Sequence, residues 1–102
     1  MNPIYTKDGY YEAILQLRPL DKKVLDYVYS QIIKNNVAIA KEVELKEGFD
    51  LYISSSKFAI MLGKKLKKRF PGTVKTSRTL FTQNKLTSKR VYRVTVCFRL
   101  KQ

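Results

Sequence analysis

Nine cationic side chains in the second half of the chain have the type and spacing needed to bind phosphate groups. They are Lys57, Lys64, Lys67, Lys68, Lys75, Arg78, Lys85, Lys89 and Arg90. Lysine and arginine neutralise phosphates and release condensed counterions, which supplies most of the affinity of sequence-independent nucleic-acid binding. Phosphate contacts position a protein but carry no sequence information. The set therefore predicts binding to a folded polyanion by shape and charge, and it does not predict base-specific readout.

The charge of the chain divides at Asp50, its last acidic residue. The formal net charge of the 102 residues is +13. The 52 residues after Asp50 carry 14 Lys and Arg and no Asp or Glu, whereas the first 50 carry 7 basic and 8 acidic side chains. Like charges at this density repel one another and weaken the compact state unless a polyanion offsets them. Nucleic acid is the first candidate partner.

The composition argues against several kinds of site. The chain has no His, the commonest general base and metal ligand. Its one cysteine, Cys97, excludes an internal disulfide and a multi-cysteine zinc site within the chain. None of the four glycines forms part of a P-loop or a G-x-G-x-x-G motif. We therefore expect no catalytic residue, no metal site and no cofactor, and we do not expect an enzyme.

Length and hydropathy bound the class of protein. A chain of 102 residues has the length of one domain, and we expect residues 1–102 to form a single basic α+β domain. The longest apolar run, residues 58–62, is far shorter than the roughly 20 residues that span a bilayer. The first residues do not form a secretory signal pattern. The expected location is cytoplasmic, or nuclear and cytoplasmic in a eukaryote.

Hydrophobic patterns in the first half predict one strand, one helix and two further strands. Pro19 ends the first strand, and Asp21 is the predicted N-cap of the helix. Asn35 and Asn36 form a plausible C-terminal stop because Asn tolerates the left-handed conformation. In the second strand Val37, Ile39, Val43 and Leu45 alternate, with Lys41 in the same phase. The predicted strands cover residues 10–18, 37–46 and 49–53, and the helix covers residues 22–35.

A second helix, residues 57–70, follows a run of three serines that supplies its N-cap. Phe58, Leu62, Leu66 and Phe70 recur every four residues. Because this apolar stripe must face the core, the lysines of the helix cluster on roughly the opposite arc. The helix has no Asp or Glu to form i,i+4 pairs with them. A Lys-rich surface selected for solubility is the simpler alternative.

Two strands, residues 73–82 and 89–100, complete the predicted elements, and residues 83–88 join them as a hairpin loop with basic residues at its tip. In the last strand one face is predicted to be buried, and the other carries Arg93, Thr95, Cys97 and Arg99. The buried face comprises Tyr92, Val94, Val96, Phe98 and Leu100. The inward face of the preceding strand is ambiguous, because Arg78 falls in phase with Val74. Lysines in such a hairpin also protect an edge strand from aggregation.

The order of elements predicts an α+β fold. Two helices packed on one face of a mostly antiparallel sheet bury both apolar stripes. The simplest arrangement is a ferredoxin-like βαββαβ fold with an extra C-terminal strand. A KH-like arrangement ranks lower because no G-x-x-G lies between the helices. An RRM is disfavoured because no segment fits its aromatic RNP motif.

Three segments of the chain resemble the central region of the NMD-three family, adaptor proteins of the large ribosomal subunit with shorter archaeal relatives. They are residues 10–18 (YYEAILQLR), 47–55 (EGFDLYISS) and 75–80 (KTSRTL), and residues 92–96 also fit. The paired C-x-x-C zinc modules and the C-terminal transport region of the family are missing. The resemblance implies binding to ribosomal RNA or the large ribosomal subunit during late assembly or export. Asp50 and Tyr52 lie in the most family-like segment, and we interpret both as structural.

Two alternatives to RNA binding follow from the same residues. A protein-interaction module that docks on an acidic protein partner would show similar salt sensitivity, but its complexes would survive nuclease treatment. Binding to an anionic membrane surface would require the basic second helix to lie flat on lipid. That helix needs its apolar stripe for the core, so we expect no membrane partner. The sequence does not indicate an oligomeric state.

Overall fold

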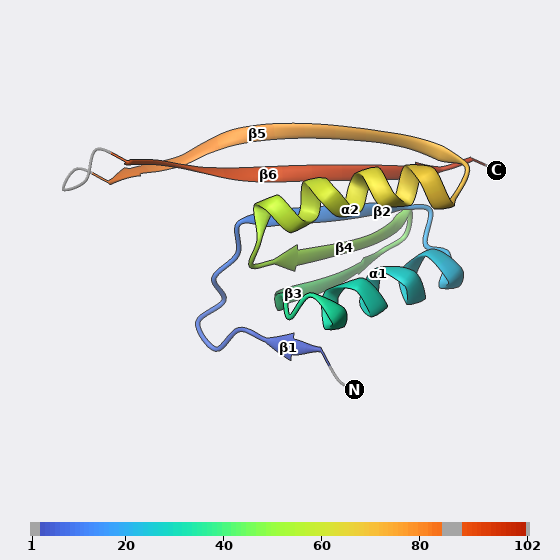
Figure 1. Cartoon of the computed structure of the whole chain (residues 1–102), viewed down its shortest axis with the longest axis horizontal. Helices are drawn as coiled ribbons and strands as arrows, with labels where there is room; N and C mark the ends of the chain where they lie inside the picture. Colours follow the sequence, from blue (N-terminus) through green and yellow to red (C-terminus); the bar gives the residue numbers. More distant parts are fainter. Residues whose placement is uncertain (1–2, 85–88, 102) are drawn as a thin grey trace.

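A sheet covered on one face by two helices forms the fold in the computed structural model (Figure 1). The structure describes residues 3–84 and 89–101, and side chains for residues 3–79 and 92–101. In that part of the chain neither helix is long and apolar enough to cross a membrane. The elements are β1 (Ile4–Tyr5), β2 (Ala13–Arg18), α1 (Lys22–Lys34), β3 (Ala38–Leu45), β4 (Gly48–Ile53), α2 (Ser56–Arg69), β5 (Gly72–Asn84) and β6 (Lys89–Leu100).

The strand order in the six-stranded sheet is β1-β3-β4-β2-β6-β5. The pairs β3–β4, β2–β4 and β5–β6 are antiparallel, while β2–β6 and β1–β3 are parallel. The predicted fold class is confirmed: two helices pack on a mostly antiparallel, ferredoxin-like sheet with an added strand. The C-terminal strand β6 is inserted between β2 and β5. The short strand β1 was not predicted, because two residues are too few to show alternation.

Both helices begin at the predicted caps. The Asp21 carboxylate accepts hydrogen bonds from the backbone N–H groups of Lys23 and Val24, at 2.9 and 3.2 Å. Asn36 has a φ of 55°, so it takes the left-handed conformation expected just after α1. The Ser55 hydroxyl accepts from the N–H of Phe58 at 3.1 Å. These local signals start and end each helix within one or two residues of the predicted bounds.

A long-range contact adds to the cap of α2. Glu12, just before β2, accepts a hydrogen bond from the backbone N–H of Ser56 through Oε1, at 3.2 Å. Its Oε2 accepts from the hydroxyl of Tyr10 at 2.6 Å. The hydrogen bond to the Glu12 carboxylate raises the pKa of Tyr10 above its ordinary value. The negative charge of Glu12 also interacts favourably with the positive, N-terminal end of the α2 helix dipole. This end of α2 is therefore already occupied by an acidic side chain.

The core lies between the helices and the facing side of the sheet. Leu15, Leu51 and Val96 on the strands, and Leu62 and Leu66 on α2, have no solvent exposure. Gly63 brings α2 close to the sheet: a Cβ at this position would lie 2.8 Å from Val96 Cγ1 and 3.2 Å from Val74 Cγ1. Contact this close fixes which side of α2 is turned inward.

One part of the predicted alternation is wrong. The register of β3 and β4 shifts between Ile39 and Lys41, so that Lys41 is paired with Tyr52 and Glu42 with Leu51. This bulge turns Val43 and Leu45 onto the face of the sheet away from the helices. It turns Glu42 toward them, where its carboxylate accepts a hydrogen bond from the Tyr29 hydroxyl of α1.

We predict that replacing Leu66 destabilises the fold far more than replacing Met61 on the same helix. Leu66 is fully buried, whereas Met61 is 38% exposed. Leu66→Ala should lower the free energy of unfolding by about 2–5 kcal/mol, because it removes buried methyl groups and leaves a cavity. Met61→Ala should change it by about 0.5 kcal/mol or less. Urea unfolding followed by circular dichroism measures both, and equal losses would contradict the observed orientation of α2.

Candidate nucleic-acid interface

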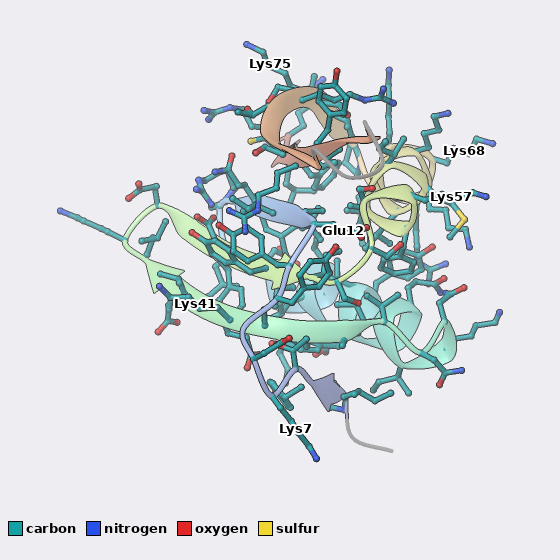
Figure 2. All side chains as sticks on the ribbon, turned by 90° about the vertical axis from the view of Figure 1, so that its left-hand side faces the viewer. Lys7, Glu12, Lys41, Lys57, Lys68 and Lys75 are labelled. Carbon is teal, nitrogen blue, oxygen red and sulfur yellow. The ribbon has the colours of Figure 1, made fainter. Side chains whose placement is uncertain are left out.

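Four of the predicted phosphate-binding residues lie together on the outer side of α2. Lys57, Lys64, Lys67 and Lys68 are all exposed and face away from Leu62 and Leu66; we call them the α2 lysine face. Figure 2 shows Lys57 and Lys68 extending outward from α2. Among the residues that the structure describes, none of these four lysines makes an ion pair or a side-chain hydrogen bond. Their charges are therefore available to an external anion.

Two further cations of α2 are engaged in packing against α1. Lys65 Nζ donates a hydrogen bond to Gln31 Oε1 at 3.3 Å. The guanidinium carbon of Arg69 lies 4.8 Å from the ring centroid of Tyr27 on α1. This geometry is that of a cation–π contact. Lys65 and Arg69 thus connect the helices and do not extend the α2 lysine face.

Arg78 joins the N-terminal end of the α2 lysine face. In the β5–β6 register it lies opposite Val94, whose side chain is buried toward the helices. Arg78 therefore lies on the helix side of β5, which resolves the ambiguity left by the sequence. It remains exposed. A hollow of about 300 Å³ is lined by Ser56, Lys57, Ile60, Arg78, Tyr92 and Val94.

Lys75 lies on the opposite face of the sheet from the other described members of the set. It is paired with Cys97, and both positions point away from the helices. In Figure 2 Lys75 is at the top of the view, apart from Lys57 and Lys68 on the right. The predicted set is therefore not one continuous surface.

The hairpin residues of the predicted set have no described side chains. Lys89 and Arg90 begin β6, where their backbones are paired with Asn84 and Gln83 of β5. Lys85 lies outside the described residues. The paired strands β5 and β6 reach well beyond the start of α2 at this end of the molecule (Figure 1).

A cluster that the sequence did not predict lies on the sheet face away from the helices. The rings of Tyr11 and Tyr52 meet edge to face, with centroids 4.9 Å apart. The Arg93 guanidinium carbon lies 3.9 Å from the centroid of Tyr11, and its Nη1 donates to the Tyr11 hydroxyl at 3.0 Å. Lys41 Nζ lies 5.7 Å from the centroid of Tyr52. Strand alternation placed Arg93 on this face, but only the register between distant strands brings the four residues together.

The geometry of Asp50 agrees with a structural role. The Asp50 residue is 8% exposed, and its Oδ1 lies 2.7 Å from Nη1 of Arg18. Arg18 Nη1 also donates to the backbone carbonyl of Leu17 at 3.0 Å. Asp50 is on β4 and Arg18 on β2, so the ion pair joins two central antiparallel strands. Tyr52, two residues on, is half-buried and packs against Tyr11.

We predict that Asp50→Asn destabilises the protein because Arg18 then keeps a largely buried charge without a counter-charge. The loss in free energy of unfolding should reach about 3 kcal/mol, at the lower end for a buried pair because some water remains accessible. Glu47→Gln in the neighbouring turn removes the same charge from an exposed position and is the matched control. Its effect should stay within about 0.5 kcal/mol. Equal urea midpoints for the two variants would show that the ion pair contributes nothing.

Comparison with known proteins identifies the family of the chain. No curated protein matches the chain. The family model described as NMD3, second domain, matches residues 10–100, a range that holds both helices and every strand except β1. That family is associated with the ribosome and with large-subunit biogenesis and export. The match includes the three segments whose sequences resemble the family, and the chain therefore belongs to the NMD-three (NMD3) family, with residues 10–100 corresponding to its second domain.

Proposed function

We propose that the chain is a non-catalytic binding domain that contacts ribosomal RNA on the large ribosomal subunit. The contacts are made by the α2 lysine face, by Arg78 beside it, and by Lys85, Lys89 and Arg90 of the β5–β6 hairpin. The family associates with large-subunit biogenesis, so structured ribosomal RNA is the polyanion that this surface would meet.

One observation carries the proposal: four exposed lysines share one side of α2, and no described carboxylate pairs with them. Lys64 and Lys68 are four residues apart, where like charges destabilise a helix by a few tenths of a kcal/mol. An ordinary solvated helix mixes charges of both signs. A helix that keeps uncompensated lysines on one side is favoured when phosphates supply the missing negative charge.

The geometry suits a phosphate backbone. Lys57 and Lys68 are eleven residues apart, which is about 16 Å along a helix at 1.5 Å per residue. Arg78 continues the positive surface at the end where the hairpin begins. This row of cations spans several phosphates of a folded RNA. Because phosphate contacts do not identify bases, recognition depends on the shape of the RNA.

The salt dependence of binding to large-subunit ribosomal RNA tests the proposal. If six to ten phosphates are engaged, affinity should fall by roughly three to five orders of magnitude between 50 and 200 mM salt. The variant Lys64→Gln/Lys67→Gln/Lys68→Gln should bind more weakly, and its slope of log affinity against log salt should be shallower by about 2–3, since each lost contact removes about 0.7–0.9.

The matched control removes the same charge from the other helix. Lys22, Lys23 and Lys34 of α1 are exposed, and Lys22→Gln/Lys23→Gln/Lys34→Gln should leave the slope nearly unchanged. If the two triple variants change the slope equally, the effect depends on net charge alone. That result would refute the proposal of a specific binding surface. Complexes recovered from cell extract that persist after nuclease treatment would instead indicate docking on an acidic protein.

A further inference from the structure

The β5–β6 half of the sheet forms a second polar surface on the side away from the helices. Val94, Val96 and Phe98 of β6 are buried toward the helices, so the intervening residues of β6 and their partners on β5 face the other way. We call this surface the β5–β6 open face. Its cross-strand pairs are Thr73 with Arg99, Lys75 with Cys97, Ser77 with Thr95, and Thr79 with Arg93.

The charge of the β5–β6 open face is positive. Lys75 and Arg99 are exposed, and Arg93 is half-buried against Tyr11. Neither β5 nor β6 contains an acidic residue. Elsewhere in the sheet, the Asp50 carboxylate of β4 is ion-paired with Arg18 of β2. The carboxylate of Glu12, just before β2, accepts hydrogen bonds from Ser56 and Tyr10. Glu47, in the turn before β4, lines a hollow together with Arg99 but forms no ion pair with it among the described residues.

The side chains of this face are of the kinds that contact a sugar–phosphate backbone. They are cations and hydroxyls, together with one cysteine, and no large apolar side chain is among the eight. Lys, Arg, Ser and Thr are among the side chains that contact phosphate and sugar. Protein–protein interfaces are enriched in aromatic residues, Met and Arg and depleted in Lys and Ser, so Lys75, Ser77 and the absence of aromatic residues among the eight favour a nucleic acid. Successive residues on one face of a strand are about 7 Å apart, so two paired strands present a grid of donors.

The β5–β6 open face and the α2 lysine face point in different directions. The sheet lies between them, with α2 packed on one side through Gly63 and Val96. In Figure 2 Lys75 is directed away from the side on which Lys57 and Lys68 extend. One straight RNA segment bound along α2 would leave the β5–β6 open face uncovered.

We propose that the β5–β6 open face binds the sugar–phosphate backbone of a second RNA segment, through Lys75, Arg99 and the neighbouring hydroxyls of β5 and β6. Arg93 is held in position by its stacking on Tyr11 and borders this site. The chain then joins two RNA segments on opposite sides of its sheet. The joining of two segments rests on the proposed function of α2, whereas binding at the open face does not.

Cys97 reports directly on occupancy of the open face. It is the one cysteine of the chain, is half-buried, and lies between Lys75 of β5 and Gln16 of β2. Its rate of alkylation by iodoacetamide, measured without and with saturating ribosomal RNA fragments, should fall several-fold when RNA is bound. An unchanged rate at saturation would overturn the proposal while leaving the function of α2 intact.

Variants that replace cations by neutral glutamine distinguish RNA contact at the open face from a general electrostatic effect on the thiol. Lys75→Gln/Arg99→Gln should abolish the protection of Cys97 and weaken binding of the second RNA about tenfold, as expected for two lost phosphate contacts. Lys22→Gln/Lys23→Gln on α1 removes the same charge and should preserve both. If both double variants keep full protection, the open face does not contact RNA.

A two-colour RNA assay tests whether the chain joins two segments. Two RNA fragments with different fluorophores should give energy transfer with the native chain, and the signal should be lost in Lys75→Gln/Arg99→Gln while one fragment still binds. If RNA does not protect Cys97 of the native chain but binding still depends on salt and on the α2 lysine face, only the second site is refuted. If the α2 triple variant binds RNA as tightly as the native chain and Cys97 is still protected, the function proposed for α2 is refuted. The same result supports RNA binding at the open face.

Discussion

Burial of the apolar side of α2 against β6 is the constraint on which the rest of the molecule depends. Leu62 and Leu66 lie wholly inside, and Gly63 leaves no room for a side chain between the helix and Val96. A rotation of α2 by one residue, about 100°, would bring charged side chains into the core. The inward stripe therefore determines which lysines face solvent, so the positive surface follows from the packing of the core.

The position of β6 has a second consequence. Because β6 is paired with β2 on one edge and with β5 on the other, it is an internal strand, and α2 covers one of its faces. The opposite side of β6 and β5 remains uncovered by either helix, and β5 forms the edge of the sheet. Exposed lysine and hydroxyl side chains on an edge strand also discourage pairing with other chains. The same residues can therefore keep the protein from aggregating and meet a phosphate backbone.

Features encoded by neighbouring residues could be predicted from the sequence, and features that depend on distant pairing could not. Asp21 and Ser55 cap the helices, and Phe58 and Leu66 mark the buried side of α2, because these signals lie within a few residues of one another. The bulge after Ile39 has no such signal, and it reverses the faces of every later residue in β3.

The candidate site shows the same division. Helical periodicity was enough to group Lys57, Lys64, Lys67 and Lys68. The separation of Lys75 from Arg78 required the register of β5 against β6, since a shift of one residue would exchange their faces. The contact of Tyr11 with Tyr52 and Arg93 joins β4, β6 and the segment before β2, and no local pattern encodes it.

Chemical acetylation of lysines in the chain bound to large ribosomal subunits tests most directly whether the α2 lysine face contacts RNA, because it measures the reactivity of each lysine separately. Mass spectrometry before and after binding compares the α2 lysine face with Lys22, Lys23 and Lys34 of α1, which are exposed in the free protein. The account predicts strong protection of Lys57, Lys64, Lys67 and Lys68 and unchanged reactivity on α1. Protection of the α1 lysines with a fully reactive α2 would contradict it.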